Sequence, residues 1–299
     1  MSLKIRHKRI NLLAKNWKLK KINPLIVSYK IKSDFFEEFK FNIKLYISKA
    51  LKIKFELDDK KFIKNIDKAR NNRLNITPNG AIVPKREFHL EYNLVLRSWC
   101  ELVRQMSLKD KKLLKLFRIT PNIRIKFGRE LSDNKNRSLS TSYPHSDAWV
   151  EGPWGMNCFI PFFGDTKKNT LKFYEPKDKF KESFLNLSAS YKDMQWVLKY
   201  YKPIKNLDIK KGHVNISDYA AIHHTNRKKN SGTRVSIDTT FLIGNFKMHK
   251  DKMREYTKKI PGIGQDYFID SGQYENDKPA KKISTFSHYT SKVLKIIKF

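Results

Sequence analysis

The sequence predicts an α+β protein with an all-β core, a double-stranded β-helix or jelly roll, preceded by a mostly helical part. Apolar residues recur near helical spacing in the first 118 residues, whereas segments that alternate apolar and polar residues follow from Thr120. Many short strands after a helical start are typical of a jelly-roll barrel. We therefore expect a helical scaffold over 1–118, a β core over 119–245, and a basic C-terminal extension over 246–299 as a candidate lid.

The helical part is expected to begin after a stretch without a clear pattern. Residues 1–33 alternate Lys with Leu and Ile, and Pro24 is incompatible with a helix interior there. Ser33 is expected to cap a helix that opens with Asp34, because an acidic first turn offsets the helix dipole. Further helices are expected over 58–70, over 86–106 and, opened by Ser107, over 111–117.

The β core is expected to start where Ile123, Ile125 and Phe127 alternate with polar residues. A loop over 128–142, rich in Asn, Ser and charge, follows and is a candidate lid, since such loops often carry function. The segment around His145 is expected to be extended. Further strands are expected at 156–163, 170–174, 213–217, 219–224 and 233–243, with a helical or irregular stretch at 177–202.

Composition restricts the class of protein. Among the 299 residues, 39% are hydrophobic and 13% aromatic, which is enough to build a core and excludes a disordered chain. The longest apolar runs are too short for a transmembrane helix, and the basic N-terminus is not followed by a secretory signal. Cys100 and Cys158 are too few for a disulfide framework and are expected to be buried. We expect a cytoplasmic protein with no membrane partner.

The net charge of +34 needs its own interpretation. It comes from 49 Lys and 14 Arg spread along the whole chain, with abundant Ile and Asn. A surface that reads phosphates more often uses clustered Arg, so the excess is better explained by biased composition. An acidic partner or substrate, including nucleic acid, remains the alternative.

Two residues with metal-ligating side chains stand two positions apart at His145 and Asp147. In an extended strand, side chains at i and i+2 leave on the same face, so an imidazole nitrogen and a carboxylate oxygen would meet at one point. They are two of the three ligands of the facial triad that holds non-haem Fe(II) and leaves coordination positions open. His-x-Asp is a weak motif by itself, so a second His and an anion-binding Arg are required downstream.

Both requirements are met further along the chain. Gly212 opens a stretch that reads as a pair of strands and ends at His223, eleven residues later, and Arg234 follows after eleven more. Because His223 and His224 are adjacent, only one of them can face inward. On the residues alone, either His223 or His224 could be the ligand. The spacing of the family that the chain resembles, given below, favours His223, and His224 is the alternative.

The strand that begins at Arg234 has a polar face and a mostly apolar face. The polar face consists of Arg234, Ser236, Asp238 and Thr240, and the other face consists of Val235, Ile237, Thr239 and Phe241. A polar inner face suits a barrel that encloses a polar ligand, and the planar fork of an Arg grips a carboxylate. The alternative is a surface strand whose polar residues face water.

The order His-x-Asp, distant His and Arg-x-Ser over residues 142–241 resembles that of the Fe(II)/2-oxoglutarate-dependent dioxygenases. Within them, the two intervals of eleven residues resemble the phytanoyl-CoA hydroxylase-like branch, and especially oxygenases of bacterial carbohydrate and aminoglycoside gene clusters. The sequence departs from that branch at His224, where a Gly commonly follows the ligand, and at His213, where an Asp is frequent.

The resemblance implies a set of ligands and a reaction. Fe(II) would be bound by the catalytic residues His145, Asp147 and His223. The distal carboxylate of the co-substrate 2-oxoglutarate would be bound by Arg234 and Ser236. Reaction with molecular oxygen would release succinate and hydroxylate a small polar substrate, such as a sugar.

Other candidate residues follow from the same expectation. Asn157 is a candidate contact for 2-oxoglutarate or substrate if Cys158 points outward, and the candidate substrate contacts are Tyr143, Trp149, Trp154 and Arg124. Two other functions remain as alternatives: an oxygenase that acts on nucleic acid or protein, and a non-enzymatic basic jelly-roll binding protein.

Overall fold

The computed structural model describes residues 2–71, 74–107, 114–118, 120–128 and 137–243, together with five short strands after residue 255. The helices are α1 (Leu3–Asn16), α2 (Ser33–Leu51), α3 (Asp59–Lys68), α4 (His89–Ser107) and α5 (Ala148–Glu151), with 3-10 turns at Arg86–Phe88, Glu182–Leu185 and Gln195–Tyr200. The strands up to residue 243 are β1 (Lys20–Asn23), β2 (Ile26–Lys30), β3 (Leu114–Arg118), β4 (Asn122–Lys126), β5 (Gly155–Gly164), β6 (Asn169–Pro176), β7 (Tyr201–Pro203), β8 (His213–Asp218), β9 (Ile222–Arg227) and β10 (Arg234–Ile243).

The short strands after residue 255 are β11 (Tyr256–Thr257), β12 (Tyr267–Ile269), β13 (Tyr274–Glu275), β14 (Lys278–Pro279) and β15 (Ile296–Lys298). Most of the predicted C-terminal extension, 246–299, and most of the predicted lid loop lie outside the described residues.

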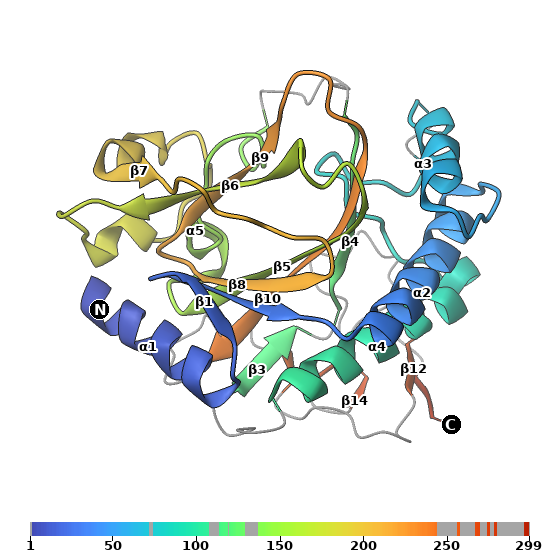
Figure 1. Cartoon of the computed structure of the whole chain (residues 1–299), viewed down its shortest axis with the longest axis horizontal. Helices are drawn as coiled ribbons and strands as arrows, with labels where there is room; N and C mark the ends of the chain where they lie inside the picture. Colours follow the sequence, from blue (N-terminus) through green and yellow to red (C-terminus); the bar gives the residue numbers. More distant parts are fainter. Residues whose placement is uncertain are drawn as a thin grey trace.

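Two antiparallel sheets form the centre of the fold (Figure 1). The larger sheet has the order β1-β2-β8-β5-β10-β3-β11. On one side of β10, β4 pairs with its first half and β3 pairs with its last residues. The smaller sheet has the order β7-β6-β9. Strands β1 and β2 come from the predicted N-terminal scaffold, and β2 pairs with β8 of the predicted β core.

The hydrophobic core lies between the larger sheet and the helices. Alternation along β5 sends Cys158 and Phe162 into this core, whereas Asn157 and Phe159 leave on the opposite face. Phe162 stacks on Phe36 of α2, with ring centroids 5.2 Å apart. Helices α1, α2 and α4 therefore cover one face of the sheet and leave the other face turned toward β6 and β9 (Figure 1).

Four predictions of local structure need correction. Residues 3–16 form a helix, which the alternating composition concealed, and Lys32 rather than Ser33 is the N-cap of α2. Residues 114–118 form a strand instead of a helix, because they pair with the end of β10. The predicted strand at 219–224 begins only at Ile222, after a turn in which Ala221 N–H donates to the carbonyl of Asp218.

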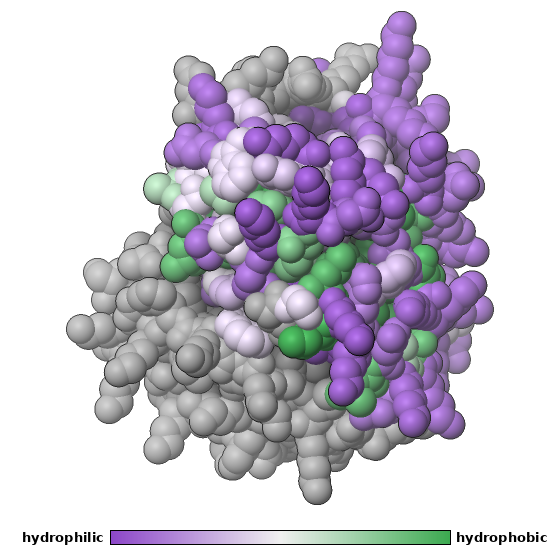
Figure 2. Space-filling view, turned by 90° about the vertical axis from the view of Figure 1, so that its left-hand side faces the viewer, coloured by the Kyte–Doolittle hydropathy of each residue, from purple (hydrophilic) through white to green (hydrophobic). Residues whose placement is uncertain are grey.

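The surface and the cysteines agree with the composition. Among the coloured residues of the face seen in Figure 2, hydrophilic ones predominate, with apolar residues in scattered groups between them. Cys100 and Cys158 are free and buried, as predicted. In the described part of the chain, no helix is both long and apolar enough to cross a membrane.

A buried ion-pair cluster attaches α1 to the larger sheet. The guanidinium of Arg6 is fully buried and donates to the buried carboxylate of Asp218 at 2.7 Å and to the carbonyl of Pro153 at 3.0 Å. Its other partner is Glu182, and the neighbouring Arg9 also contacts Asp218. The cluster fixes both the end of β8 and the segment between α5 and β5.

Replacing Arg6 by Met is expected to lower the free energy of unfolding by about 3–5 kcal/mol, because the Asp218 carboxylate stays buried without its main partner. Chemical denaturation of the wild type and the variant measures the difference. The double variant Arg6→Met/Asp218→Asn, which removes both charges, should recover part of the loss. A double variant less stable than the single one would show that the packing of α1, and not the charge pair, is what matters.

Candidate functional site

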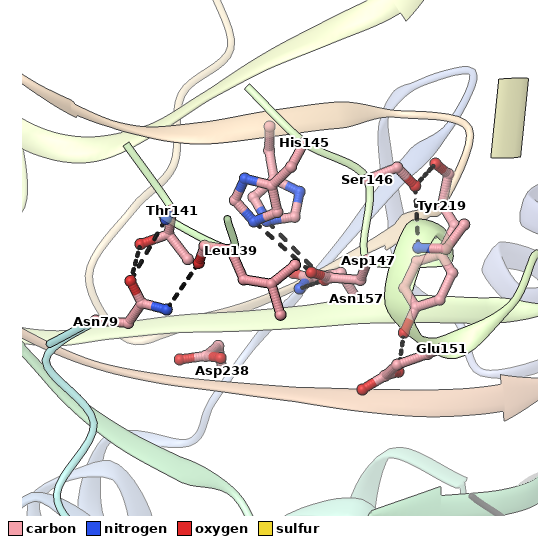
Figure 3. Close-up of polar contacts among 12 residues, drawn as sticks. Asn79, Leu139, Thr141, His145, Ser146, Asp147, Glu151, Asn157, Tyr219 and Asp238 are labelled. Carbon is pink, nitrogen blue, oxygen red and sulfur yellow. Dashed lines mark hydrogen bonds and ion pairs between the residues drawn. The ribbon is translucent and has the colours of Figure 1, made fainter. Parts of the chain in front are cut away.

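Three side chains predicted to be metal ligands converge at one point. His145, Asp147 and His223 each offer a ligand atom, and these atoms lie within 4.8 Å of one another. The Nε2 atom of His145 is 3.7 Å from Oδ1 of Asp147, and the Nε2 atom of His223 is 4.0 Å from Oδ2. Figure 3 shows the labelled His145 and Asp147 pointing toward each other. Two imidazoles and one carboxylate in this arrangement can hold a metal ion on one side and leave its other positions open.

The backbone positions the triad differently from the prediction. His145 is extended and forms a two-way backbone bridge with His223, which adds it to the edge of β9. Asp147 is not extended: with φ −63° and ψ −19° it stands directly before α5. The two side chains therefore meet because the chain turns between them, and the expected i, i+2 strand geometry is wrong.

His223 is the histidine that joins the triad, as the spacing predicted. It lies opposite Phe173 of β6, whereas His224 lies opposite Lys172 and its ring packs near Tyr174, 5.6 Å between centroids. Alternation along β9 thus sends the two histidines to opposite faces of the small sheet.

Both histidines are suited to bind a metal in the neutral form. Burial lowers the pKa of His145 to about 3 and that of His223 to about 4. The Nδ1 atom of His145 lies 2.8 Å from the carbonyl of Tyr143, so it carries the proton and leaves the Nε2 lone pair toward Asp147. The ring of His145 also stacks on Tyr191, with centroids 4.3 Å apart. The contacts fix the ring in the orientation that the site needs.

Asp147 is oriented by Asn157. The side-chain amide of Asn157 donates to Oδ2 of Asp147 at 2.7 Å (Figure 3). The carboxylate of Asp147 lies in the wall of the cavity, and its burial there raises its pKa. The hydrogen bond from Asn157 favours the ionised form against that effect.

A second polar group, Arg234 and Ser236, lines the same cavity from the beginning of β10. Arg234 is 1% exposed, and burial lowers its pKa to about 9, which leaves it charged near neutral pH. One terminal nitrogen donates to the carbonyl of Asn169, and the guanidinium lies 5.0 Å from the ring centre of Phe159. Its Nε and the hydroxyl of Ser236 are buried without a hydrogen-bond partner among the described residues. Buried donors left in this way require an acceptor from a ligand or water.

The cavity that contains these groups has a volume of about 710 Å³ and is lined from both sheets. Of the predicted contacts, Arg124 and Asn157 line it, whereas Tyr143, Trp149 and Trp154 do not. Trp149 is fully buried in a separate aromatic cluster, and its indole N–H donates to the carbonyl of Phe184. Tyr143 contributes its carbonyl to His145, and Trp154 contributes its carbonyl to Arg9. Neither tryptophan side chain lines the cavity, although Glu151 between them does.

The structure adds residues that the sequence did not single out. Lys126 lies directly opposite Arg234 in register, so a second buried cation lines the same end of the cavity. Asp238, noted only as part of a polar face, is paired with Arg124. Asn79 joins two loops at the cavity: its side chain donates to the carbonyl of Leu139 and accepts from Thr141 (Figure 3). Alternation in 122–126 pointed to Lys126, but nothing in the sequence indicated Asn79.

Comparison with solved structures finds resemblances at low identity. A dioxygenase of N-substituted L-amino acids from Burkholderia ambifaria has 12% identity and a TM-score of 0.39, over 82% of this chain and 89% of that one. HygX from Streptomyces hygroscopicus, solved with nickel and 2-oxoglutarate bound, has 8% identity and a TM-score of 0.37, over 80% and 87%. The α-ketoglutarate-dependent epimerase SnoN of nogalamycin biosynthesis has 8% identity and a TM-score of 0.36, over 79% and 83%.

No family model matches the chain, and no curated protein matches it. With TM-scores below 0.5, the structural resemblances carry no functional weight by themselves. The residues of this chain themselves form a His-Asp-His group that is able to hold a metal ion. The buried guanidinium of Arg234 lines the same cavity.

Proposed function

We propose that this protein is an Fe(II)- and 2-oxoglutarate-dependent oxygenase that hydroxylates a small polar substrate. The observation that carries the proposal is the shared cavity of His145, Asp147 and His223 with Arg234 and Ser236. Two neutral imidazoles and one carboxylate are the donor set of a facial-triad iron site. The buried, unpartnered donors of Arg234 and Ser236 are what the distal carboxylate of a keto diacid requires.

The roles of the residues follow from their contacts. His145, Asp147 and His223 would hold the iron, which when bound supplies the activation of molecular oxygen that a protein side chain cannot. Arg234 and Ser236 would anchor 2-oxoglutarate, and Lys126 adds a second positive charge at the same end of the cavity. Enclosure between the two sheets would exclude bulk water from the reacting groups.

Asn157 receives a role different from the predicted contact with 2-oxoglutarate or substrate. One N–H of its side-chain amide is donated to Asp147, and its unpartnered Oδ1 is an acceptor that cannot bind a carboxylate. Asn157 is therefore a positioning residue for the metal ligand.

The double-stranded β-helix is part of the same proposal. Two antiparallel sheets that line one cavity, with His145 and His223 at the smaller one, support it. The intervals of eleven residues from Gly212 to His223 and on to Arg234 support the phytanoyl-CoA hydroxylase-like branch. Gly212 fits its place there, because its φ of +72° lies in the left-handed region that favours glycine.

The proposal is tested by binding and then by turnover. Isothermal titration without oxygen should show that Mn(II), a redox-inert substitute for Fe(II), binds at one site, and that 2-oxoglutarate binds tightly only after Mn(II). Adding Fe(II) and oxygen should then release succinate slowly even without substrate. Equal affinity for 2-oxoglutarate with and without metal would contradict the proposal.

Replacing Asn157 by Ala is expected to weaken metal binding by about 10–100-fold, the usual loss when an outer partner of a ligand is removed. The reason is that Asp147 loses its 2.7 Å hydrogen bond. Titration with Mn(II) measures it. Asn215→Ala is the matched control, since Asn215 is equally buried on β8 but bonds only to backbone carbonyls. Equal effects from the two variants would assign the loss to general destabilisation.

A further inference from the structure

Arg124 is held rigidly in the cavity beside the triad. Its Nε and one terminal nitrogen both donate to the carboxylate of Asp238, the latter at 2.7 Å. Its other terminal nitrogen donates to the carbonyl of Asn79 at 3.0 Å. Arg124 lines the same cavity as His145, Asp147 and His223.

The guanidinium of Arg124 is fixed by its hydrogen bonds, but not all of its N–H donors are used. A guanidinium carries five N–H donors, and the three hydrogen bonds to Asp238 and Asn79 leave one N–H on each terminal nitrogen. Arg124 lines the cavity, and its side chain is only 16% exposed. Two remaining donors on a rigid fork suit a planar anion.

The carboxylates of the cavity are better supplied with partners. Among the described residues, Asp238 accepts two hydrogen bonds from Arg124 and one from Asn122. Glu151 accepts from the hydroxyl of Tyr219 (Figure 3). It also accepts from the hydroxyl of Thr240. A cationic ligand would therefore have to compete with donors already in place, whereas an anionic ligand meets donors that are still available.

The charge balance of the cavity points the same way. Among the described residues, its lining contains four cationic side chains, namely Arg124, Lys126, Arg137 and Arg234, and three carboxylates, namely Asp147, Glu151 and Asp238. A divalent metal ion and a dianionic 2-oxoglutarate offset each other. One positive charge is then left, and buried charges are stable when they are paired.

We infer that the substrate carries a carboxylate or another planar anionic group, and that Arg124 binds it on the metal side of the cavity. The inference rests on the proposed function and narrows its substrate from a small polar molecule to a small acid. Asp238 and Asn79 are positioning residues in this account, since they reach the substrate only through Arg124.

The test uses formate, the smallest carboxylate, so that no assumption about the rest of the substrate is needed. Full-length protein is first loaded with Mn(II) and saturating 2-oxoglutarate without oxygen, and loading is followed by the loss of the free Mn(II) spin-resonance signal. The relaxation rate of ¹³C-formate is then measured as formate is titrated. The wild type should show a saturable enhancement from formate bound near Mn(II).

Two variants assign that binding to a residue. Arg124→Gln/Asp238→Asn removes the fork without changing the net charge and should weaken formate binding by about tenfold or more, as expected for loss of a charged hydrogen-bond donor. Arg137→Gln removes one charge from the same cavity but leaves the fork of Arg124 in place. It should weaken formate binding less than the double variant does, which controls for general electrostatic attraction.

The outcomes separate the inference from the function on which it rests. Failure of Mn(II) and 2-oxoglutarate to load contradicts the proposed function. With loading intact, an absent enhancement in the wild type, or one unchanged in the Arg124→Gln/Asp238→Asn variant, overturns the inference. Enhancement that disappears as 2-oxoglutarate is raised also overturns it, because the anion would then occupy the co-substrate site.

Discussion

Asp147→Ala is expected to abolish the binding of a divalent metal ion. Asp147 is the only carboxylate in the group of His145, Asp147 and His223, and the group brings its three ligand atoms within 4.8 Å. Loss of an outer partner alone weakens metal binding by about 10–100-fold, so loss of the charged ligand itself should exceed that range. Titration of the purified variant with Mn(II) without oxygen measures the affinity.

Matched controls make this result specific. Asp193→Ala removes an exposed carboxylate from the chain segment that carries Tyr191 and should bind Mn(II) like the wild type. His224→Ala should also retain binding, whereas His223→Ala should lose it, because only His223 faces Asp147. Retained affinity in Asp147→Ala, or a loss in His224→Ala as large as that in His223→Ala, would place the metal elsewhere.

Arg234→Met is expected to weaken the binding of 2-oxoglutarate by about 100-fold or more while the affinity for Mn(II) stays near that of the wild type. Truncating one member of a buried charge pair costs roughly 2–5 kcal/mol, which corresponds to this range. The guanidinium is 1% exposed and has an unpartnered Nε, so a bound carboxylate would satisfy it. Titration of the Mn(II)-loaded variant with 2-oxoglutarate measures the effect.

A structural role for Arg234 predicts a different pattern. If Arg234 serves to bind 2-oxoglutarate, the metal-free Arg234→Met variant should be at least as stable as the wild type, because Met removes a buried charge at similar volume. Loss of stability together with equal losses of metal and 2-oxoglutarate affinity would make Arg234 a folding residue. Arg234→Lys separates charge from shape, since Lys keeps the charge but lacks the fork that binds a carboxylate through two nitrogens.

Much of the site was predictable because it depends on short-range patterns. Alternation along β10 correctly separated Arg234 and Ser236 from Val235 and Ile237, which pack in the core. The choice of His223 over His224 came from the spacing of the family that the sequence resembles, and His223 is the one that faces Asp147. Period-two alternation is local, so it survives without knowledge of the fold.

The errors arose where contacts distant in the sequence decide the structure. Residues 114–118 have a composition that suits a helix, yet pairing with β10 makes them a strand. The helix α1 is stabilised by Arg6, whose partner Asp218 is 212 positions away. Asp147 does join His145 and His223 in one group, but not for the predicted reason, since it stands before a short helix and not in a strand. Propensity is a weak guide wherever tertiary contacts of this kind compete with it.

The direct test of the central proposal is a crystal structure of the protein grown without oxygen in the presence of Mn(II) and 2-oxoglutarate. Anomalous density is expected between Nε2 of His145, Nε2 of His223 and the carboxylate of Asp147, with one end of 2-oxoglutarate on the metal and the other on Arg234. Metal density at any other group of residues, or 2-oxoglutarate bound away from Arg234, would contradict it.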